Sequence, residues 1–102
     1  MSRMIHIQIP KEKIVDFCRQ NHIRKLSLFG SVLRDDFRAD SDVDVLVEFE
    51  PDAPHSLFDL VRMQGELAEL LGHKVDLIEG TALRNPFRRY EIMRTQQVIF
   101  GA

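Results

Sequence analysis

Apolar residues recur along this chain at two spacings, which predict three helices and four strands. Helical spacing covers about 10–22, 57–71 and 86–94. Short apolar runs typical of strands cover about 25–29, 43–49, 74–78 and 97–100. Ser56 followed by Asp59 has the pattern of a capping box, and Gly72 suits the end of the same helix. This order predicts an α/β fold, a small mixed sheet flanked by helices, in a single domain over residues 1–102.

A strand–turn–strand segment in the first half carries an unusual pair of acidic residues. Gly30-Ser31 closes the first predicted strand, and Asp42-Val43-Asp44 opens the second after a gap of ten residues. Because side chains alternate along a strand, Asp42 and Asp44 point to the same face, with Cβ atoms roughly 6–7 Å apart. For the two halves of this motif to meet, the two strands must run antiparallel.

The residue types of this motif suit a metal and a phosphate. Two ionised carboxylates repel each other, whereas a divalent cation such as Mg²⁺ prefers oxygen ligands and reverses that repulsion. Glycine lets a ligand approach the backbone, and a helical turn begun by Ser31 offers N–H groups and a hydroxyl to a phosphate. Arg34, one turn further on, can add a positive charge. The segment therefore predicts half a metal site beside half a phosphate site.

A third acidic residue, Asp76, interrupts the apolar run of the third predicted strand. Carboxylates are rarely buried unless they are paired or bind a metal. If this strand lies beside the second, Asp76 completes a cluster of three carboxylates. The alternative is an acidic side chain that simply faces solvent between Val75 and Leu77.

Composition narrows the class of protein. The 102 residues are 44% apolar, carry a net charge of −2 and include a single cysteine, Cys18, which is expected to be a buried thiol. The absence of a membrane-length apolar run and of a secretory stretch over residues 1–6 favours a cytoplasmic protein. Eight acidic residues lie within 35–52 against Arg38 alone, so no direct nucleic-acid binding is expected.

Other site chemistries lack their motifs. The run from Asp40 begins like a calcium loop, but Val45 stands where that loop needs glycine and Pro51 where it needs glutamate. Walker and dinucleotide glycine motifs are absent from the sequence, and the four histidines show no metal-ligand spacing.

Gly30-Ser31, the gap of ten, Asp42-x-Asp44 and the later Asp76 resemble the signature of the nucleotidyltransferases of the DNA polymerase beta superfamily. The short length and the residues around the motif are most similar to the minimal nucleotidyltransferases, commonly the antitoxin halves of HEPN/MNT toxin–antitoxin pairs. The resemblance covers most of the chain and implies a polymerase-beta-like core.

This resemblance implies transfer of a nucleoside monophosphate, AMP from ATP, to a hydroxyl of a partner protein, here a HEPN ribonuclease toxin. Two Mg²⁺ ions would be held by Asp42 and Asp44, with Asp76 on the acceptor-side ion and helping to deprotonate the acceptor. Gly30 and Ser31 would hold the β- and γ-phosphates.

Two alternatives remain open from the sequence. The chain could neutralise its partner by occlusion without catalysis, or modify a small molecule as a homodimer; homo- and hetero-oligomers are both compatible with it. Four C-terminal arginines are expected on a solvated helix face, with contact to a nucleotide or partner as the alternative: Arg84, Arg88, Arg89 and Arg94.

Overall fold

The computed structural model describes residues 7–38 and 40–101, so residues 1–6, for which no secretory stretch is expected, lie outside the described part. Four strands form one mixed sheet in the order β3-β2-β1-β4. Their bounds are β1 (Ile23–Phe29), β2 (Val43–Phe49), β3 (Val75–Glu79) and β4 (Gln97–Phe100). β1 runs antiparallel to β2 and to β4, and β3 runs parallel to β2. The predicted α/β fold and the antiparallel first pair are confirmed.

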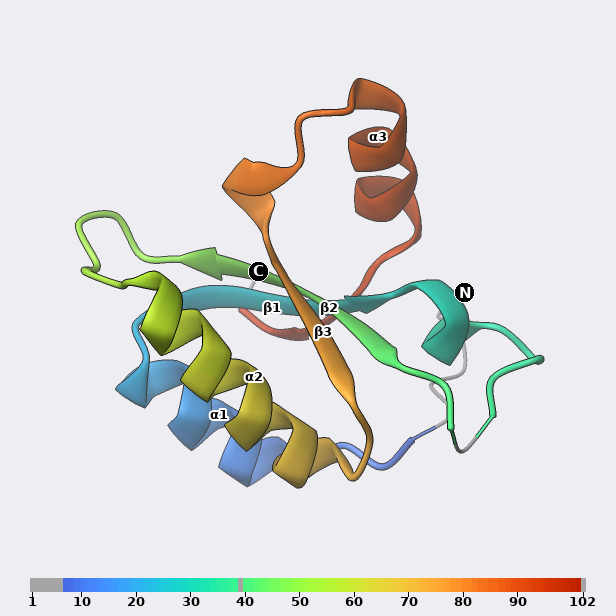
Figure 1. The fold of residues 1–102 in the computed structure, drawn as a ribbon, viewed down its shortest axis with the longest axis horizontal. Helices are drawn as coiled ribbons and strands as arrows, with labels where there is room; N and C mark the ends of the chain where they lie inside the picture. Colours follow the sequence, from blue (N-terminus) through green and yellow to red (C-terminus); the bar gives the residue numbers. More distant parts are fainter. Residues whose placement is uncertain (1–6, 39, 102) are drawn as a thin grey trace.

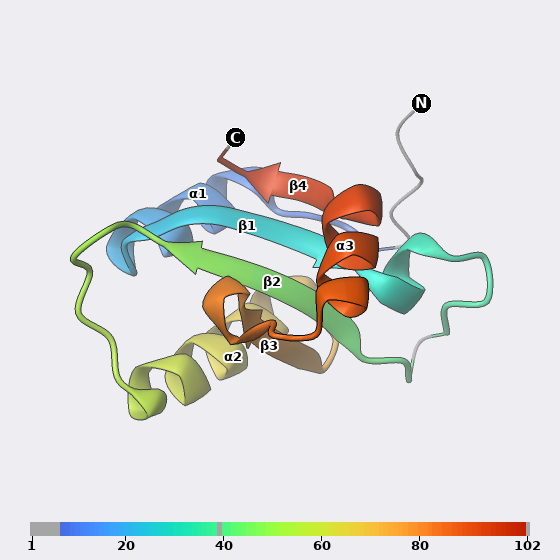
Figure 2. The ribbon, with the colours of Figure 1, turned by 90° about the horizontal axis from the view of Figure 1, so that it is seen from above.

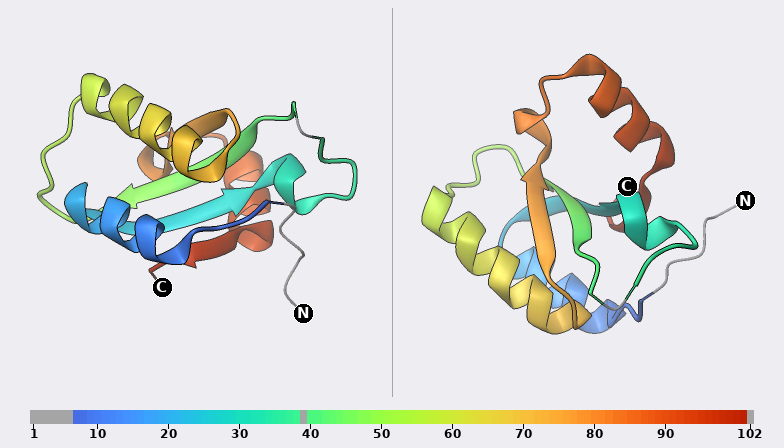
Figure 3. Two further views of the ribbon diagram at one scale, coloured as in Figure 1. Left: turned by 90° about the horizontal axis from the view of Figure 1, so that it is seen from below. Right: turned by 45° about the vertical axis from the view of Figure 1, so that its right-hand side comes forward.

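Three helices cover the two faces of the sheet unequally. α1 (Lys11–Gln20) and α2 (Leu57–Leu71) lie side by side on one face, and α3 (Pro86–Thr95) crosses the other (Figures 1 and 2). In the right-hand view of Figure 3 the sheet is the middle layer, with α1 and α2 on one side and α3 on the other. The helices and strands lie within two residues of their predicted bounds.

The alternation of side chains along β2 divides the apolar residues between two cores. Val43, Val45 and Val47 are fully buried against α1 and α2 in the larger core. The intervening Leu46 packs on the α3 side, in a small core with three other buried residues, Phe29, Leu83 and Ile92. Asp44 and Leu46 share this second face because they are two apart in the strand.

Cys18 is buried in the larger core, as the sequence predicts, and burial raises the pKa of its thiol to about 12. The start of α2 has the predicted capping box: the Ser56 hydroxyl accepts from the Asp59 N–H at 3.3 Å, and the Asp59 carboxylate accepts from the Ser56 N–H at 2.8 Å. Gly72 ends the helix in the left-handed conformation, with φ +71°. In the described part of the chain, none of the helices has both the length and the apolar content that crossing a bilayer requires.

Candidate active site

Asp44 and Asp76 are paired directly in the register of the parallel strands β2 and β3. Residues paired in this way present their side chains to the same face of the sheet, here the face that carries α3. Asp42 lies two residues before Asp44, at the entry to β2, and is exposed. The backbone therefore brings all three predicted carboxylates to one end of one face.

Electrostatics shows that these carboxylates interact. The pKa of Asp44 is raised above its usual value, first by partial burial and then by the negative charges of Asp76 and Asp42. Two arginines act in the opposite direction, Arg88 more strongly than Arg34. Asp44 is thus the centre of the acidic group, half-buried between like charges on both sides.

Burial is not what distinguishes Asp76. Its side chain is exposed, and the strand that carries it, β3, is at the edge of the sheet. The apolar run around Asp76 suggests that its carboxylate is buried, and this expectation is wrong. The pairing with Asp44, rather than removal from solvent, places Asp76 in the cluster.

The turn after β1 approaches Asp44 closely. η1 (Gly30–Leu33) is the expected helical turn, of the 3₁₀ type, and Gly30 enters it with φ +75°, in the left-handed region. A Cβ atom on Gly30 would collide with the Asp44 carboxylate oxygen Oδ2. Glycine is therefore required here both for its backbone conformation and for lack of a side chain.

Ser31 joins the two halves of the motif. Its hydroxyl donates to the backbone carbonyl of Asp42 at 3.3 Å, which fixes the loop before β2 against the turn after β1. In this structure the hydroxyl is thus engaged with the protein rather than directed only at a ligand. Arg34 is exposed and pairs with Asp36, with Nε 3.4 Å from Oδ1, while its charge still reaches Asp44.

Arg88 belongs to this neighbourhood, although the sequence favours a solvated surface for it. It precedes the buried Ile92 by four residues, so both occupy the side of α3 that faces the sheet. Ile92 packs with Leu46, two residues from Asp44. Asn85 caps the helix, with its side-chain oxygen accepting from Phe87 N–H at 3.0 Å and Arg88 N–H at 3.2 Å. The i, i+4 spacing of Arg88 and Ile92 in the sequence indicates that the two side chains share one side of a helix. It indicates that Arg88 lies near Asp44 only when α3 is known to cross β2.

The donor set fits divalent cations. Hard ions such as Mg²⁺ take oxygen ligands, and three carboxylates on one face supply only oxygen. Among the described residues, no three acidic, cysteine or histidine side chains already converge on one ion-binding point. The pKa of Asp44 is raised first by burial and then by the charges of Asp76 and Asp42, and a positive ion there would oppose this second cause.

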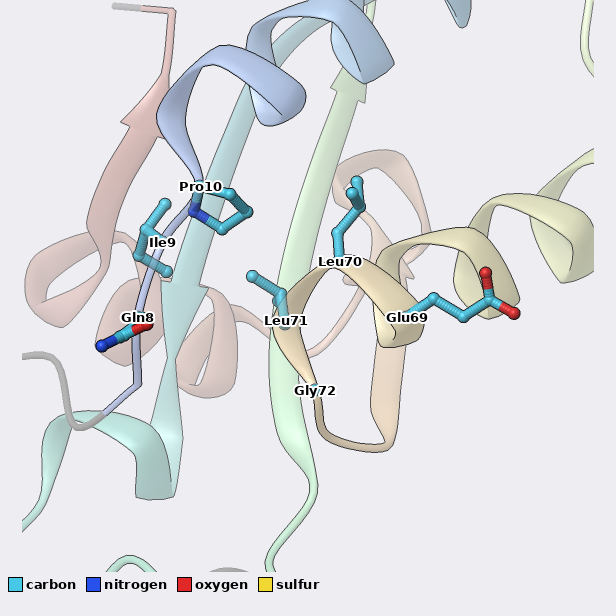
Figure 4. A pocket seen from close by; sticks show the side chains of 7 residues that line it. All are labelled: Gln8, Ile9, Pro10, Glu69, Leu70, Leu71 and Gly72. Atoms are coloured by element: carbon cyan, nitrogen blue, oxygen red, sulfur yellow. The ribbon is translucent and has the colours of Figure 1, made fainter.

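A separate cavity lies elsewhere in the described part of the chain. It measures about 520 Å³ and lies between the segment before α1 and the C-terminal end of α2 (Figure 4). Ile9, Pro10 and Leu71 turn toward this space, whereas the Glu69 carboxylate points away from Ile9 and Pro10. None of the three aspartates lines it, so it is separate from the acidic cluster.

Comparison with known proteins defines the class. The model of the nucleotidyltransferase domain family matches residues 11–99, which include the turn, the three aspartates and α3. The chain belongs to the nucleotidyltransferase family, and we conclude that it is a nucleotidyltransferase.

Two curated relatives come from archaea. Over 68 residues it is 41% identical to the candidate protein adenylyltransferase MJ0435 of Methanocaldococcus jannaschii, covering 67% of this chain and 71% of the relative. It is 40% identical over 63 residues to the protein adenylyltransferase MntA of Thermococcus cleftensis, covering 62% of each.

Solved structures agree with this class. A candidate minimal nucleotidyltransferase is 33% identical, with a TM-score of 0.69 over 85% of this chain and 86% of the other. A toxin–antitoxin complex with AMP-PNP contains a chain that is 20% identical, with a TM-score of 0.72 over 92% of this chain and 75% of that one. At that identity the second likeness shows the fold alone.

Proposed function

We propose that this chain transfers AMP from ATP to a hydroxyl group of a partner protein, with Mg²⁺, and that the partner is a HEPN ribonuclease toxin which the modification silences. The observation that carries the proposal is the in-register pair Asp44–Asp76 beside Asp42, in contact with the Gly30 turn. The names of the relatives, protein adenylyltransferases, support AMP as the group transferred. Complexes of MntA with HepT among the structural neighbours support a HEPN partner.

Each residue of the site has a role in this proposal. Asp42 and Asp44 would hold two Mg²⁺ ions and Asp76 one of them, and these ions supply positive charge to the attacking and leaving oxygens. Gly30 and Ser31 would hold the β- and γ-phosphates, and glycine is needed at position 30 because a Cβ atom there would collide with the Asp44 carboxylate. Arg34 and Arg88 add positive charge on the same side. Their charges oppose the repulsion among the carboxylates in the free protein.

The transfer itself is an in-line displacement. The acceptor oxygen forms a bond to the α-phosphorus, and the bond from that phosphorus to the oxygen of pyrophosphate breaks. The acceptor hydroxyl loses its proton, which Asp76 can take because it is exposed on the edge strand, where an acceptor can approach. The products are the adenylylated protein and pyrophosphate.

Silencing follows from charge. A bound AMP adds about one negative charge to the partner, and negative charge near a nuclease site repels RNA phosphates. Adenylylation would therefore obstruct the substrate of the toxin without unfolding it. The cytoplasm, with its ATP and Mg²⁺, is the compartment that this reaction requires.

A labelling experiment tests the proposal. The purified chain is incubated with Mg²⁺, ATP labelled on its α-phosphate and the HEPN-domain product of the adjacent reading frame. Label on that protein, lost with Asp42→Asn and Asp44→Asn together, is the expected result. Inhibition of the toxin without label or Mg²⁺ would establish occlusion instead, and label on a metabolite would establish a small-molecule transferase.

A further inference from the structure

α2 has a second, largely exposed face beside its buried one, and Ala68 of this second face packs against the larger core. Apart from its buried side, the helix carries an uncharged stripe that occupies about a third of its circumference. The members of the stripe are Leu57, Phe58, Val61, Gln64, Gly65 and Ala68. Leu57, Phe58 and Val61 are 75%, 86% and 64% exposed. The charged residues of α2 lie on the remaining side, where Arg62 pairs with Glu66 at 3.0 Å. A surface helix needs one apolar face to pack on its own core, whereas α2 has two.

The stripe continues into a groove that reaches Asp42, one of the three aspartates of the site. This groove of about 390 Å³ is lined by Val61, Gly65 and Ala68 of the stripe and by Asp42 and Lys74. A Cβ atom on Gly65 would meet nothing within 4 Å, so the groove is open above the helix. Figure 1 shows α2 running alongside β3 toward the point where β2 and β3 begin.

The stripe also touches the strand that carries Asp76. The Gln64 side-chain oxygen accepts from the Leu77 N–H at 3.0 Å, on the free edge of β3. Leu77 follows Asp76 directly. The stripe and Asp76 therefore meet at the free edge of β3, from opposite faces of the sheet.

From this continuity we infer that the uncharged stripe of α2 docks an apolar helix of the acceptor protein, and that the groove leads the acceptor hydroxyl over the β3 edge to Asp76 and Asp42. This inference rests on the proposed function, which requires a protein acceptor at these carboxylates. The stripe spans twelve residues from Leu57 to Ala68, and its two ends are about 16 Å apart at the rise of an α-helix. Small side chains at Gly65 and Ala68 allow a second helix to approach closely. A second copy of this chain seated there would cover the edge by which the acceptor enters.

Charge substitutions test the docking surface. Phe58→Glu and Val61→Glu are made singly, with Phe87→Glu on α3 as the matched control, since Phe87 is 83% exposed and outside the stripe. Transfer to the adjacent-frame HEPN protein should fall at least tenfold in the α2 variants through a higher KM for that protein. Binding of Mg²⁺–ATP, measured by calorimetry, should stay as in the wild type. The control should transfer normally.

A site-specific cross-link gives a second readout. The sequence has one cysteine, and Cys18 is buried with a pKa of about 12, so a benzophenone–maleimide added to a Val61→Cys variant reacts at residue 61. Illumination should join residue 61 to the HEPN protein without ATP, whereas Lys13→Cys on the exposed side of α1 should give no product.

The outcomes separate the two proposals. Cross-linking of the Val61→Cys variant to the HEPN protein, together with a wild-type chain that does not transfer AMP, contradicts the proposed function and supports the docking surface. Normal transfer by Phe58→Glu and Val61→Glu overturns the docking surface and leaves the function standing. Loss of transfer in Phe87→Glu alone would show that the acceptor docks on α3. If the wild type is a dimer, and Val61→Glu dissociates it without loss of transfer, the stripe serves self-association. Either result overturns the inference. A wild type that neither binds nor transfers overturns both proposals.

Discussion

Gly30 and Asp44 lie so close together that no side-chain atom fits between the turn after β1 and the start of β2. This contact joins the two halves of the Gly-Ser and Asp-x-Asp motif, in which ten residues lie between Ser31 and Asp42. The Ser31 hydroxyl donates to the Asp42 carbonyl across that gap. A glycine at this place is therefore a requirement of the site's geometry as well as of the backbone, whose φ is +75°. The requirement for space beside Asp44 and the requirement for positive φ can be separated by experiment, because Gly72 has only the positive φ.

Gly30→Ala should destabilise the fold and weaken nucleotide binding, and Gly72→Ala should do only the former. Both glycines have positive φ, +75° and +71°, and a residue with a Cβ pays about 1–2 kcal/mol in this region. At Gly72 a Cβ meets nothing within 4 Å, whereas at Gly30 it displaces the Asp44 carboxylate. Urea unfolding should show the larger loss for Gly30→Ala, and calorimetry should show weaker Mg²⁺–ATP binding for that variant alone. Equal ATP binding in the two variants would contradict the proposed place of the triphosphate.

Asp44→Asn should abolish transfer while making the metal-free protein more stable at neutral pH. The folded-state pKa of Asp44 is raised by burial and by Asp76 and Asp42, so the folded chain binds its proton more tightly than the unfolded chain does. The stabilising effect of this group is complete below the ordinary value of 3.8 and is lost as the pH rises through the raised pKa. Asn carries no charge and avoids that loss. Transfer should fall about a thousandfold or more, because metal charge stabilisation contributes several kcal/mol and each ~1.4 kcal/mol is tenfold in rate.

Thermal melts across pH check the stability half of this prediction. Without metal, the melting temperature of Asp44→Asn should exceed that of the wild type at neutral pH, and the two should converge as the medium becomes acidic. Added Mg²⁺ should raise the melting temperature of the wild type only. A variant less stable than the wild type at neutral pH without metal would show that the carboxylate stabilises the fold.

Ser56→Ala should cost about 1 kcal/mol of unfolding free energy, the usual effect of removing an N-cap hydroxyl. The pKa of Asp59 is lowered chiefly by the backbone N–H of Ser56, with smaller contributions from its hydroxyl, Arg62 and His55. Its stabilising contribution is therefore present above its ordinary pKa of 3.8 and is lost as the pH falls through the lowered value. Since alanine keeps the backbone N–H, the carboxyl of Asp59 should retain most of its low pKa, which NMR titration measures. Thr81→Ala removes another exposed hydroxyl, bonded to Glu79 at 2.8 Å, and should change stability by less than about 0.5 kcal/mol.

Local patterns predicted the elements well because each has a short-range physical cause. The capping box of Ser56 and Asp59 and the left-handed end at Gly72 fix the bounds of α2 within the sequence itself. The common face of Asp42 and Asp44 also follows from strand alternation alone. The exposure of Asp76 could not be predicted, because it depends on β3 forming the edge of the sheet. The crossing of β2 by α3, which brings Arg88 toward Asp44, likewise depends on long-range packing of Ile92 with Leu46.

Arg88→Gln should raise the KM for ATP by about tenfold or more, whereas Arg94→Gln should leave it unchanged. The charge of Arg88 reaches Asp44, and a hydrogen bond to a charged group contributes about 1.5–3 kcal/mol. Arg94 lies later in the same helix, is exposed and pairs with Glu91 at 2.8 Å, so its removal controls for the net charge of α3. Arg88→Lys should recover part of the affinity, because a lysine keeps the charge but loses the planar, two-pronged contact with phosphate. Steady-state transfer at varied ATP, with melting temperatures as a check on folding, measures all three variants. An equal rise in KM for Arg88→Gln and Arg94→Gln would show that the total charge of the helix, rather than the position of Arg88 above β2, governs nucleotide binding.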